Sequence, residues 1–299
     1  MNASVKLLER VLPSTVFVRA AIPEEHASAP ILGTERFGSG AVIDAAGLIL
    51  TVNYVVLGAA SIEVSLLDDT VVNGKVVAQD FASGLAVIEV GASVLSAVPL
   101  RASADLHVGQ EVFIAAAAGE NKRRVNNGAI SALGAFDAYW EYSLERAIST
   151  TAMNPGLGGA PLFDTGGRMC GVVSLDIGEV GRFTLAIPVD EYLEHRDELL
   201  RYGRRVTRPS RAWIGFYCYT FRDHVVIAGV LPGAPGEQAG LKAGDVVLTV
   251  NGHRITARHE LYSCLSAHRP GELIQFRIFR NNEVTQLAVA SGNAEEFFA

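Results

Sequence analysis

The first two thirds of this sequence contain hydroxyls and a thiol that could act as nucleophiles and histidines that could act as bases. The candidate nucleophiles in or near its glycine-containing segments are three hydroxyls and one thiol, at Ser39, Ser83, Ser149 and Cys170. The candidate bases are three histidines, at His26, His107 and His195. A hydroxyl attacks a carbonyl carbon only with a base beside it, and no sequence motif pairs any of these histidines with a nucleophile. A hydrolase with an unrecognised nucleophile is kept as an alternative hypothesis.

Histidine and cysteine could instead bind a metal ion. The three histidines of this region lack the i, i+4 spacing that places two ligands on one helix face. The cysteines, Cys170, Cys218 and Cys264, are far apart and form neither a CxxC pair nor a zinc spacing. We therefore expect no metal and no cofactor, and a metal-binding accessory protein stands as a further alternative.

The most informative segment is a glycine-rich loop. Residues 154–162 read NPGLGGAPL, and residues 166–172 read GGRMCGV. This pattern resembles the active-site loop of the HtrA (Deg) serine proteases, in which the nucleophilic serine follows Asn-Pro-Gly-Asn and precedes Gly-Gly-Pro-Leu. The resemblance places Gly158 at the position of that serine.

Two earlier segments resemble the same family, in the same order along the chain. Residues 38–56, GSGAVIDAAGLILTVNYVV, resemble the segment that ends in Thr-Asn-x-His-Val-Val, which places Tyr54 at the catalytic histidine. Residues 80–88, DFASGLAVI, resemble Asp-Pro-x-x-Asp-Leu-Ala-Val, which places Gly84 at the catalytic aspartate. With the terminal module, the resemblance covers nearly the whole chain.

The three replacements remove every part of the triad mechanism, in which a carboxylate orients an imidazole and the imidazole takes the proton of the serine. A phenol titrates near pH ~10, so Tyr54 cannot act as a base near neutral pH. Gly84 and Gly158 supply neither a carboxylate nor a hydroxyl. A laboratory inactivation would usually change the serine alone. We therefore predict a natural pseudoprotease and not an enzyme.

The last third of the sequence resembles a PDZ domain. Residues 230–252, VLPGAPGEQAGLKAGDVVLTVNG, resemble the PDZ signature of HtrA proteins, with Asn251-Gly252 as a type I′ turn. PDZ domains add a bound peptide as a strand to a sheet edge and hold its terminal carboxylate with backbone amides. The resemblance assigns the carboxylate loop and edge strand to Trp213, Ile214, Gly215, Phe216 and Tyr217. It assigns the facing helix wall to His259, Tyr262, Ser263 and Ser266.

Side chains in this module could also belong to its core. Trp213 and Phe216 fit core packing and ligand contact equally, whereas Leu261 and Leu265, four residues apart, favour the core. The chain finishes with the apolar residues 297–299, FFA. We hypothesise that this tail docks into its own or a neighbour's PDZ domain, and a solvated tail is the alternative.

The predicted function is binding of C-terminal or unfolded peptides, as a scaffold, a chaperone-like factor or a regulator of an active HtrA relative. The family resemblance implies a homo-oligomer, a trimer or larger, built through the barrel domain.

Short strands must position these residues. The strands are expected at residues 15–20, 40–44, 48–52, 62–66, 71–78 and 85–90, where apolar residues often alternate with polar ones. A change of period predicts one amphipathic helix over 188–200, and two more helices are expected over 235–239 and 257–267. The expected fold is mainly β, a trypsin-like double β-barrel followed by a small α+β PDZ domain. The expected domains are residues 1–203 and 212–299, joined by a linker over 204–211.

Composition and charge limit the other classes of protein to which the chain could belong. The chain has 299 residues, 49% of them hydrophobic, and a net charge of −7. This charge gives no broad positive field, so nucleic acid is an improbable partner. No apolar run approaches the ~20 residues of a membrane span. The chain as written fits the cytoplasm, and a periplasmic or membrane-tethered protein is expected if a signal or anchor precedes it.

Overall fold

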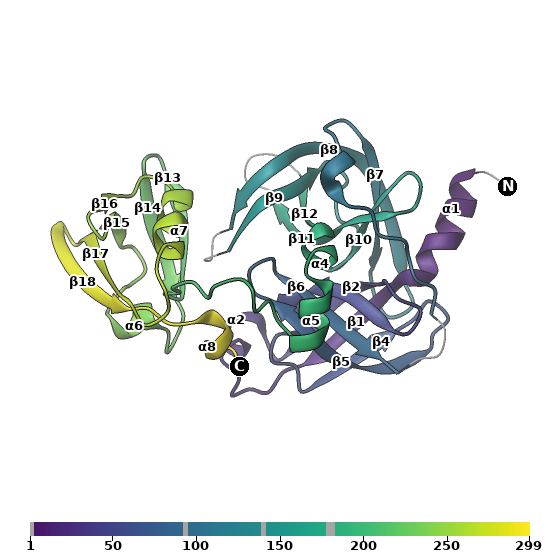
Figure 1. Ribbon diagram of the computed structural model, residues 1–299, viewed down its shortest axis with the longest axis horizontal. Coiled ribbons are helices and arrows are strands. Elements are labelled where there is room, and N and C mark those ends of the chain that lie inside the picture. The colour runs from purple at the N-terminus through teal and green to yellow at the C-terminus, as the bar shows by residue number, and fades with distance from the viewer. Residues whose placement is uncertain (1–2, 92–94, 139–141, 178–182) are drawn as a thin grey trace. The chain divides into compact units, whose positions relative to one another are not determined.

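The computed structural model describes residues 3–91, 95–138, 142–177 and 183–299, which form two compact units (Figure 1). The first unit comprises Met1–Ala135 and Glu145–Val206, and the second comprises Phe136–Leu144 and Thr207–Ala299.

The first half of the first unit is a closed six-stranded barrel. Its strands are β1 (Thr15–Ala21), β2 (Glu35–Val42), β3 (Leu48–Val52), β4 (Ser61–Ser65), β5 (Val71–Asp80) and β6 (Leu85–Val90). They pair in the order β1-β2-β3-β6-β5-β4. Of the alternation predicted for residues 62–66, the part at Ile62, Glu63 and Val64 is confirmed. The rest is wrong, because Ser65 is buried and Leu66 is half-buried beyond the strand.

The second half repeats this architecture. Its strands are β7 (Glu111–Ala117), β8 (Arg123–Asp137), β9 (Ser143–Thr150), β10 (Pro161–Asp164), β11 (Met169–Ile177) and β12 (Phe183–Pro188). They close in the order β10-β11-β12-β9-β8-β7 around a core that includes Ile114, Ile148 and Leu162. The predicted double barrel is therefore confirmed.

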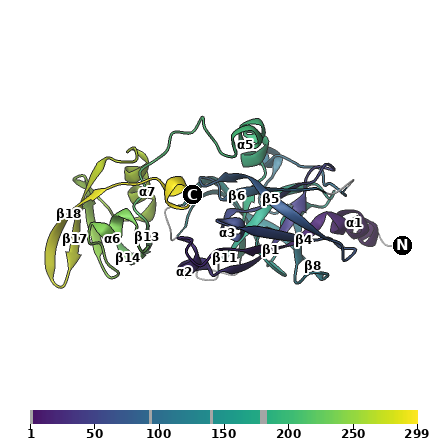
Figure 2. The same cartoon turned by 90° about the horizontal axis from the view of Figure 1, so that it is seen from below.

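Short helices complete the first unit. They are α1 (Ala3–Val11), α2 (Ala29–Leu32), α3 (Asn53–Val56), α4 (Asp190–Leu193) and α5 (Arg196–Tyr202), with single 3-10 turns at Leu12–Ser14 and Ser103–Asp105. The single helix predicted over 188–200 is wrong, because the backbone leaves helical geometry at His195 and two helices result. Figure 2 shows α5 beside β5, where Gln79 N donates to Gly203 O at 2.9 Å.

The second unit is built on one sheet. Its strands are β13 (Phe216–Phe221), β14 (His224–Val230), β15 (Val246–Val250), β16 (His253–Arg254), β17 (Leu273–Arg280) and β18 (Glu283–Ala290). They follow the order β13-β14-β15-β17-β18, with β16 paired to β15. The helices are α6 (Pro235–Gln238), α7 (Arg258–Ser266) and α8 (Ala294–Phe297). The predicted α+β architecture of this domain is confirmed.

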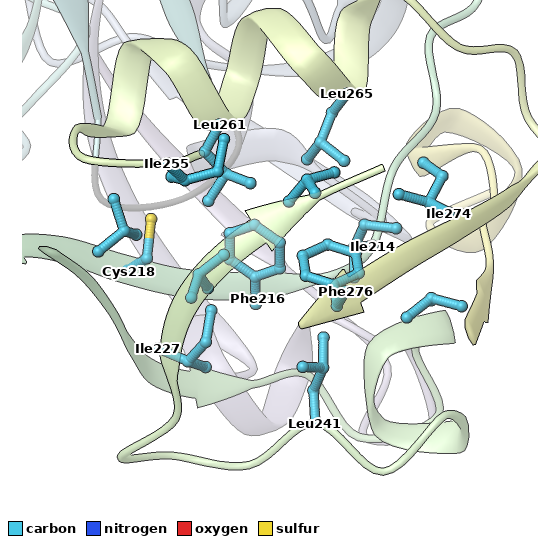
Figure 3. Close-up of a cluster of buried hydrophobic side chains, with 14 of the residues drawn as sticks. Ile214, Phe216, Cys218, Ile227, Leu241, Ile255, Leu261, Leu265, Ile274 and Phe276 are labelled. Atoms are coloured by element: carbon cyan, nitrogen blue, oxygen red, sulfur yellow. The ribbon is translucent and has the colours of Figure 1, made fainter. Parts of the chain in front are cut away.

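The core of the second unit lies between α7 and the sheet. Figure 3 shows Leu261 and Leu265 of α7 pointing toward Phe216 and Phe276 of the strands. The expectation that the two leucines belong to the core is therefore confirmed. The predicted turn at Asn251 and Gly252 has positive φ at both residues, +47° and +82°, as a type I′ turn requires.

Candidate functional site

The fold brings together the three positions that the sequence analysis assigns to the triad. Tyr54 lies in α3, directly after β3, and Gly84 lies in the turn between β5 and β6. Gly84 O accepts a hydrogen bond of 2.8 Å from Asn53 N, the first residue of α3. Gly158 comes from the second barrel, in the loop between β9 and β10, and meets the Tyr54 side chain.

Tyr54 fills the space that a side chain at residue 158 would need. Its hydroxyl donates a hydrogen bond of 2.9 Å to Ser174 O in β11. A Cβ placed on Gly158 would collide with Tyr54 Oη and would lie 3.2 Å from Tyr54 Cζ. A serine at residue 158 is therefore incompatible with this position of the tyrosine ring.

The Tyr54 hydroxyl is also a poor base. Burial, aided by the negative charge of Asp176, raises the pKa of Tyr54 to about 12. The phenol stays protonated at neutral pH, and its proton is held by the Ser174 carbonyl. The site therefore supplies neither a general base nor a phenolate nucleophile near neutral pH.

The backbone at Gly84 is unlike that of an ordinary aspartate. Its φ is +79°, a region that strains most L-residues, and its N–H donates to Asp80 O at 2.8 Å. The glycine therefore suits the tight turn between β5 and β6.

The glycine loop itself is held by backbone hydrogen bonds. Gly156 N donates to Asn154 Oδ1 at 3.2 Å, and Leu157 N donates to Ala117 O at 3.0 Å. Gly158 O accepts from Ser39 N at 2.7 Å. An oxyanion hole needs amides aimed at the reacting oxygen, and here the amides of Gly156 and Leu157 are directed to acceptors within the protein.

A buried arginine fixes the helix that carries Tyr54. Arg36 is only 5% exposed, and its guanidinium donates to Tyr54 O at 2.9 Å and to Leu57 O at 3.0 Å. These carbonyls lie at the end of α3, where a helix leaves backbone acceptors unpaired. Burial lowers the pKa of Arg36 to about 10, so it remains a cation at neutral pH. The sequence analysis did not identify this residue.

The alternative nucleophiles lie in unreactive surroundings. Ser39 is fully buried, donates to Leu157 O at 2.9 Å and accepts from Ala117 N at 3.0 Å. Cys170 is buried in the second barrel, and burial, followed by the charge of Asp164, raises its thiol pKa to about 12. Ser83 is buried in the β5–β6 turn and Ser149 is half-buried in β9.

The histidines do not gather into a site. His26 Nδ1 lies 2.7 Å from Ser28 Oγ, whereas His107 is exposed and His195 precedes the first residue of α5. Within the described ranges, no group of three or more histidine, cysteine, aspartate or glutamate residues could hold a metal ion. In the same part of the chain, no helix is both long and apolar enough to cross a membrane.

The predicted carboxylate loop precedes β13, the strand at one end of the sheet order. Gly215 has a φ of +83°, and a Cβ there would collide with Ala234 Cβ and lie 2.9 Å from Trp213 Cη2. Ile214 O and Gly215 O accept from Gly236 N and Leu231 N, both at 2.8 Å. The loop therefore has a fixed backbone path that only glycine fits without strain.

The side chains around this loop divide between core and surface. Phe216 is buried in the main core, whereas Trp213, 8% exposed, packs in a separate cluster that Tyr217 borders. In α7, Tyr262 faces β13, because its hydroxyl lies 3.4 Å from Cys218 Sγ. That hydroxyl also donates to Ala138 O at 2.8 Å, within the second unit.

The residues predicted for the helix wall differ in burial. Tyr262 is buried, whereas His259, Ser263 and Ser266 are exposed. Arg258 and Tyr262, four residues apart, both have hydrogen bonds to β13, and Arg258 N donates to Thr220 Oγ1 at 3.3 Å. The assignment of this wall to peptide binding stays a prediction.

The aromatic tail packs on its own unit. Phe297 and Phe298 are half-buried against Trp213, Leu231 and Ala234, beside the predicted carboxylate loop.

Two known protein families match separate parts of the chain. Residues 38–172 match the trypsin-like peptidase domain, and residues 209–290 match the PDZ domain.

Named relatives cover both domains. A probable periplasmic serine endoprotease, DegP-like, of Hahella chejuensis is 30% identical over 85% of this chain and 56% of its own length. Protease Do-like 1, chloroplastic, of Arabidopsis thaliana is 29% identical over 96% of this chain and 71% of its own. The chain thus spans little more than half the length of the DegP-like relative.

Solved structures share the fold over the whole chain. The HtrA-type protease AlgW with a tripeptide has a TM-score of 0.59 at 25% identity and covers 97% of both chains. The serine endoprotease from Yersinia pestis has a TM-score of 0.57 at 25% identity and covers 98% of both.

Proposed function

We propose that this chain, an HtrA-family relative with a trypsin-like peptidase domain followed by a PDZ domain, binds peptides without cleaving them. The observation that carries the proposal is the position of Tyr54. Its hydroxyl occupies the space that the Cβ of a side chain on residue 158 would need and donates a hydrogen bond to the Ser174 carbonyl. A triad needs a hydroxyl, an imidazole and a carboxylate, and Gly158, Tyr54 and Gly84 supply none of them.

The PDZ domain is the binding half of the proposal. Gly215 gives the loop before β13 a positive φ, a backbone conformation that anion-binding nests of successive amides use. β13 lies at one end of the strand order, so a peptide strand pairing with it would extend the sheet. The proposed ligands are the C-terminal ends of peptides or unfolded proteins. The proposed roles are a scaffold, a chaperone-like factor or a regulator of an active relative, in an oligomer.

One assay tests both halves. The full chain is incubated with unfolded casein, and its binding to a library of free C-terminal hexapeptides is measured in parallel. We expect binding without cleavage above a buffer control. The groove control is Gly215→Asp, and its matched partner is Gly240→Asp, because Gly240 also has positive φ, +85°, but open space around its Cα.

The outcomes separate the hypotheses. Binding lost in Gly215→Asp and kept in Gly240→Asp supports the peptide reader. Casein cleavage, or covalent labelling by a serine or cysteine probe, would instead support a hydrolase with another nucleophile and reject the non-catalytic proposal.

A further inference from the structure

The end of the chain encloses the indole that stands next to the proposed carboxylate loop. The ring centroids of Phe297 and Phe298 lie 4.8 and 5.8 Å from that of Trp213 and 4.9 Å from each other. These separations are typical of favourable aromatic pairs. Leu231 and Ala234 complete the cluster.

Backbone hydrogen bonds fix how the tail approaches the loop. Trp213 N donates to Gly292 O at 3.0 Å, and Gly292 N donates to Trp213 O at 2.8 Å. The next residue, Asn293, caps α8 by accepting from Glu295 N at 3.0 Å. The two phenylalanines are thus presented to the indole by a paired backbone and a capped helix.

The same indole contacts the glycine of the loop. A Cβ on Gly215 would lie 2.9 Å from Trp213 Cη2 and 3.1 Å from Trp213 Cζ2, so the six-membered ring packs closely on the Gly215 backbone. Any movement of the indole therefore changes the space available to the Gly215 peptide. Trp213 thus contacts both the tail and Gly215.

We propose that Phe297 and Phe298 are positioning residues that hold the Trp213 indole against Gly215 and so fix the direction of the loop amides. The inference rests on the proposed function, because it concerns how that site reads a terminal carboxylate. A loop that is ordered before binding loses less conformational freedom when the ligand arrives. Strand pairing along β13 does not require this ordering, so the tail should affect carboxylate recognition selectively.

The experiment uses the full chain and two probes. The first is a fluorescein-labelled hexapeptide selected from the free C-terminal library, and the second is the same peptide with a C-terminal amide. Dissociation constants are measured for the wild type, Phe297→Ala/Phe298→Ala and Phe297→Leu/Phe298→Leu. Phe279→Ala in β17 is the matched control, since Phe279 is a partly exposed phenylalanine of the same sheet. Trp213 emission is recorded in a Trp140→Phe background, where Trp213 is the sole tryptophan.

We expect the alanine pair to weaken binding of the free acid about tenfold, since charge-assisted hydrogen bonds depend on donor direction. Affinity for the amide should change less than about twofold, because strand pairing is kept. Trp213 emission should shift to longer wavelength as water reaches the indole. The leucine pair should restore most of the acid preference, and Phe279→Ala should leave it unchanged.

Each of the other outcomes contradicts either the proposed function or the positioning role of the two phenylalanines. If the wild type binds neither probe, the proposed function fails and this inference fails with it. If the wild type prefers the acid and the alanine pair keeps that preference, or weakens both probes equally, only the positioning role is rejected. Should circular dichroism show the alanine pair to be unfolded, Phe298→Ala alone is measured and judged by the same ratio.

Discussion

The loop at Gly158 and the loop at Gly215 each contain a glycine but differ in what surrounds it. At both glycines an added Cβ would collide with a neighbour. At Gly158 the neighbour is the Tyr54 hydroxyl, which comes from the other barrel and fills the space. At Gly215 the neighbours are Ala234 and Trp213, which pack behind a loop of positive φ. A glycine can therefore accompany a filled site or shape a binding loop, and its neighbours distinguish the two.

Hydrogen bonds hold both loops in place. In the first loop Leu157 N and Gly159 N donate to Ala117 O and Val173 O, and Gly158 O accepts from Ser39 N. In the second loop Ile214 O and Gly215 O accept from Gly236 N and Leu231 N, and Trp213 N donates to Gly292 O. Both loops therefore have a fixed backbone path, and it is the neighbours of the two glycines that distinguish them.

The largest effect is expected at Gly215. Gly215→Ala should weaken binding of the free-acid hexapeptide by about a hundredfold, because the residue must leave its positive φ and the Cβ meets Ala234 and Trp213. Fluorescence anisotropy on the full chain measures the loss. Gly240→Ala carries the same backbone penalty without a collision and should bind almost normally. Equal losses in the two variants would contradict the contrast between the loops.

A smaller effect, on stability, is expected at Gly158. Gly158→Ala should lower the free energy of unfolding by about 2 kcal/mol, since the added carbon overlaps Tyr54 Oη. In a Tyr54→Phe background the same change should cost about 1 kcal/mol less, because the colliding oxygen is absent. Urea denaturation of the four proteins in this cycle gives the coupling, with Gly134→Ala as a control whose Cβ meets no other atom. Additive effects would show that the tyrosine does not fill the space.

The architecture was largely predictable from the sequence because strands and turns have local signals. Alternating apolar residues such as Ile62 and Val64 predicted strands, and the Asn251-Gly252 pair predicted the turn between β15 and β16. The break at His195 escaped the prediction, since 188–200 keeps a helical period across it. The N-terminal helix Ala3–Val11 was not predicted either.

The candidate sites were less predictable, because their geometry depends on contacts between distant segments. Motif order assigned Tyr54 and Gly158, but nothing in the sequence indicated that the hydroxyl of one would occupy the space beside the other. Arg36 has no motif, and its role appears only when the ends of α2 and α3 come together. The same limit applies to Trp213, whose tail partners lie more than eighty residues away.

The smallest effect is a pH dependence at Tyr54 that the Gly215 loop should not share. Burial raises the pKa of Tyr54 from 10.0 to about 12, so its stabilising contribution is complete below pH 10 and is lost as pH rises through 12. Between pH 9 and 11 the wild type should lose about 1 kcal/mol more stability than Tyr54→Phe. Urea denaturation at the two pH values tests this. An equal loss of stability in the wild type and in Tyr54→Phe would mean that the hydroxyl reaches solvent and that the space beside Gly158 is open. That result would remove the main support for a filled site.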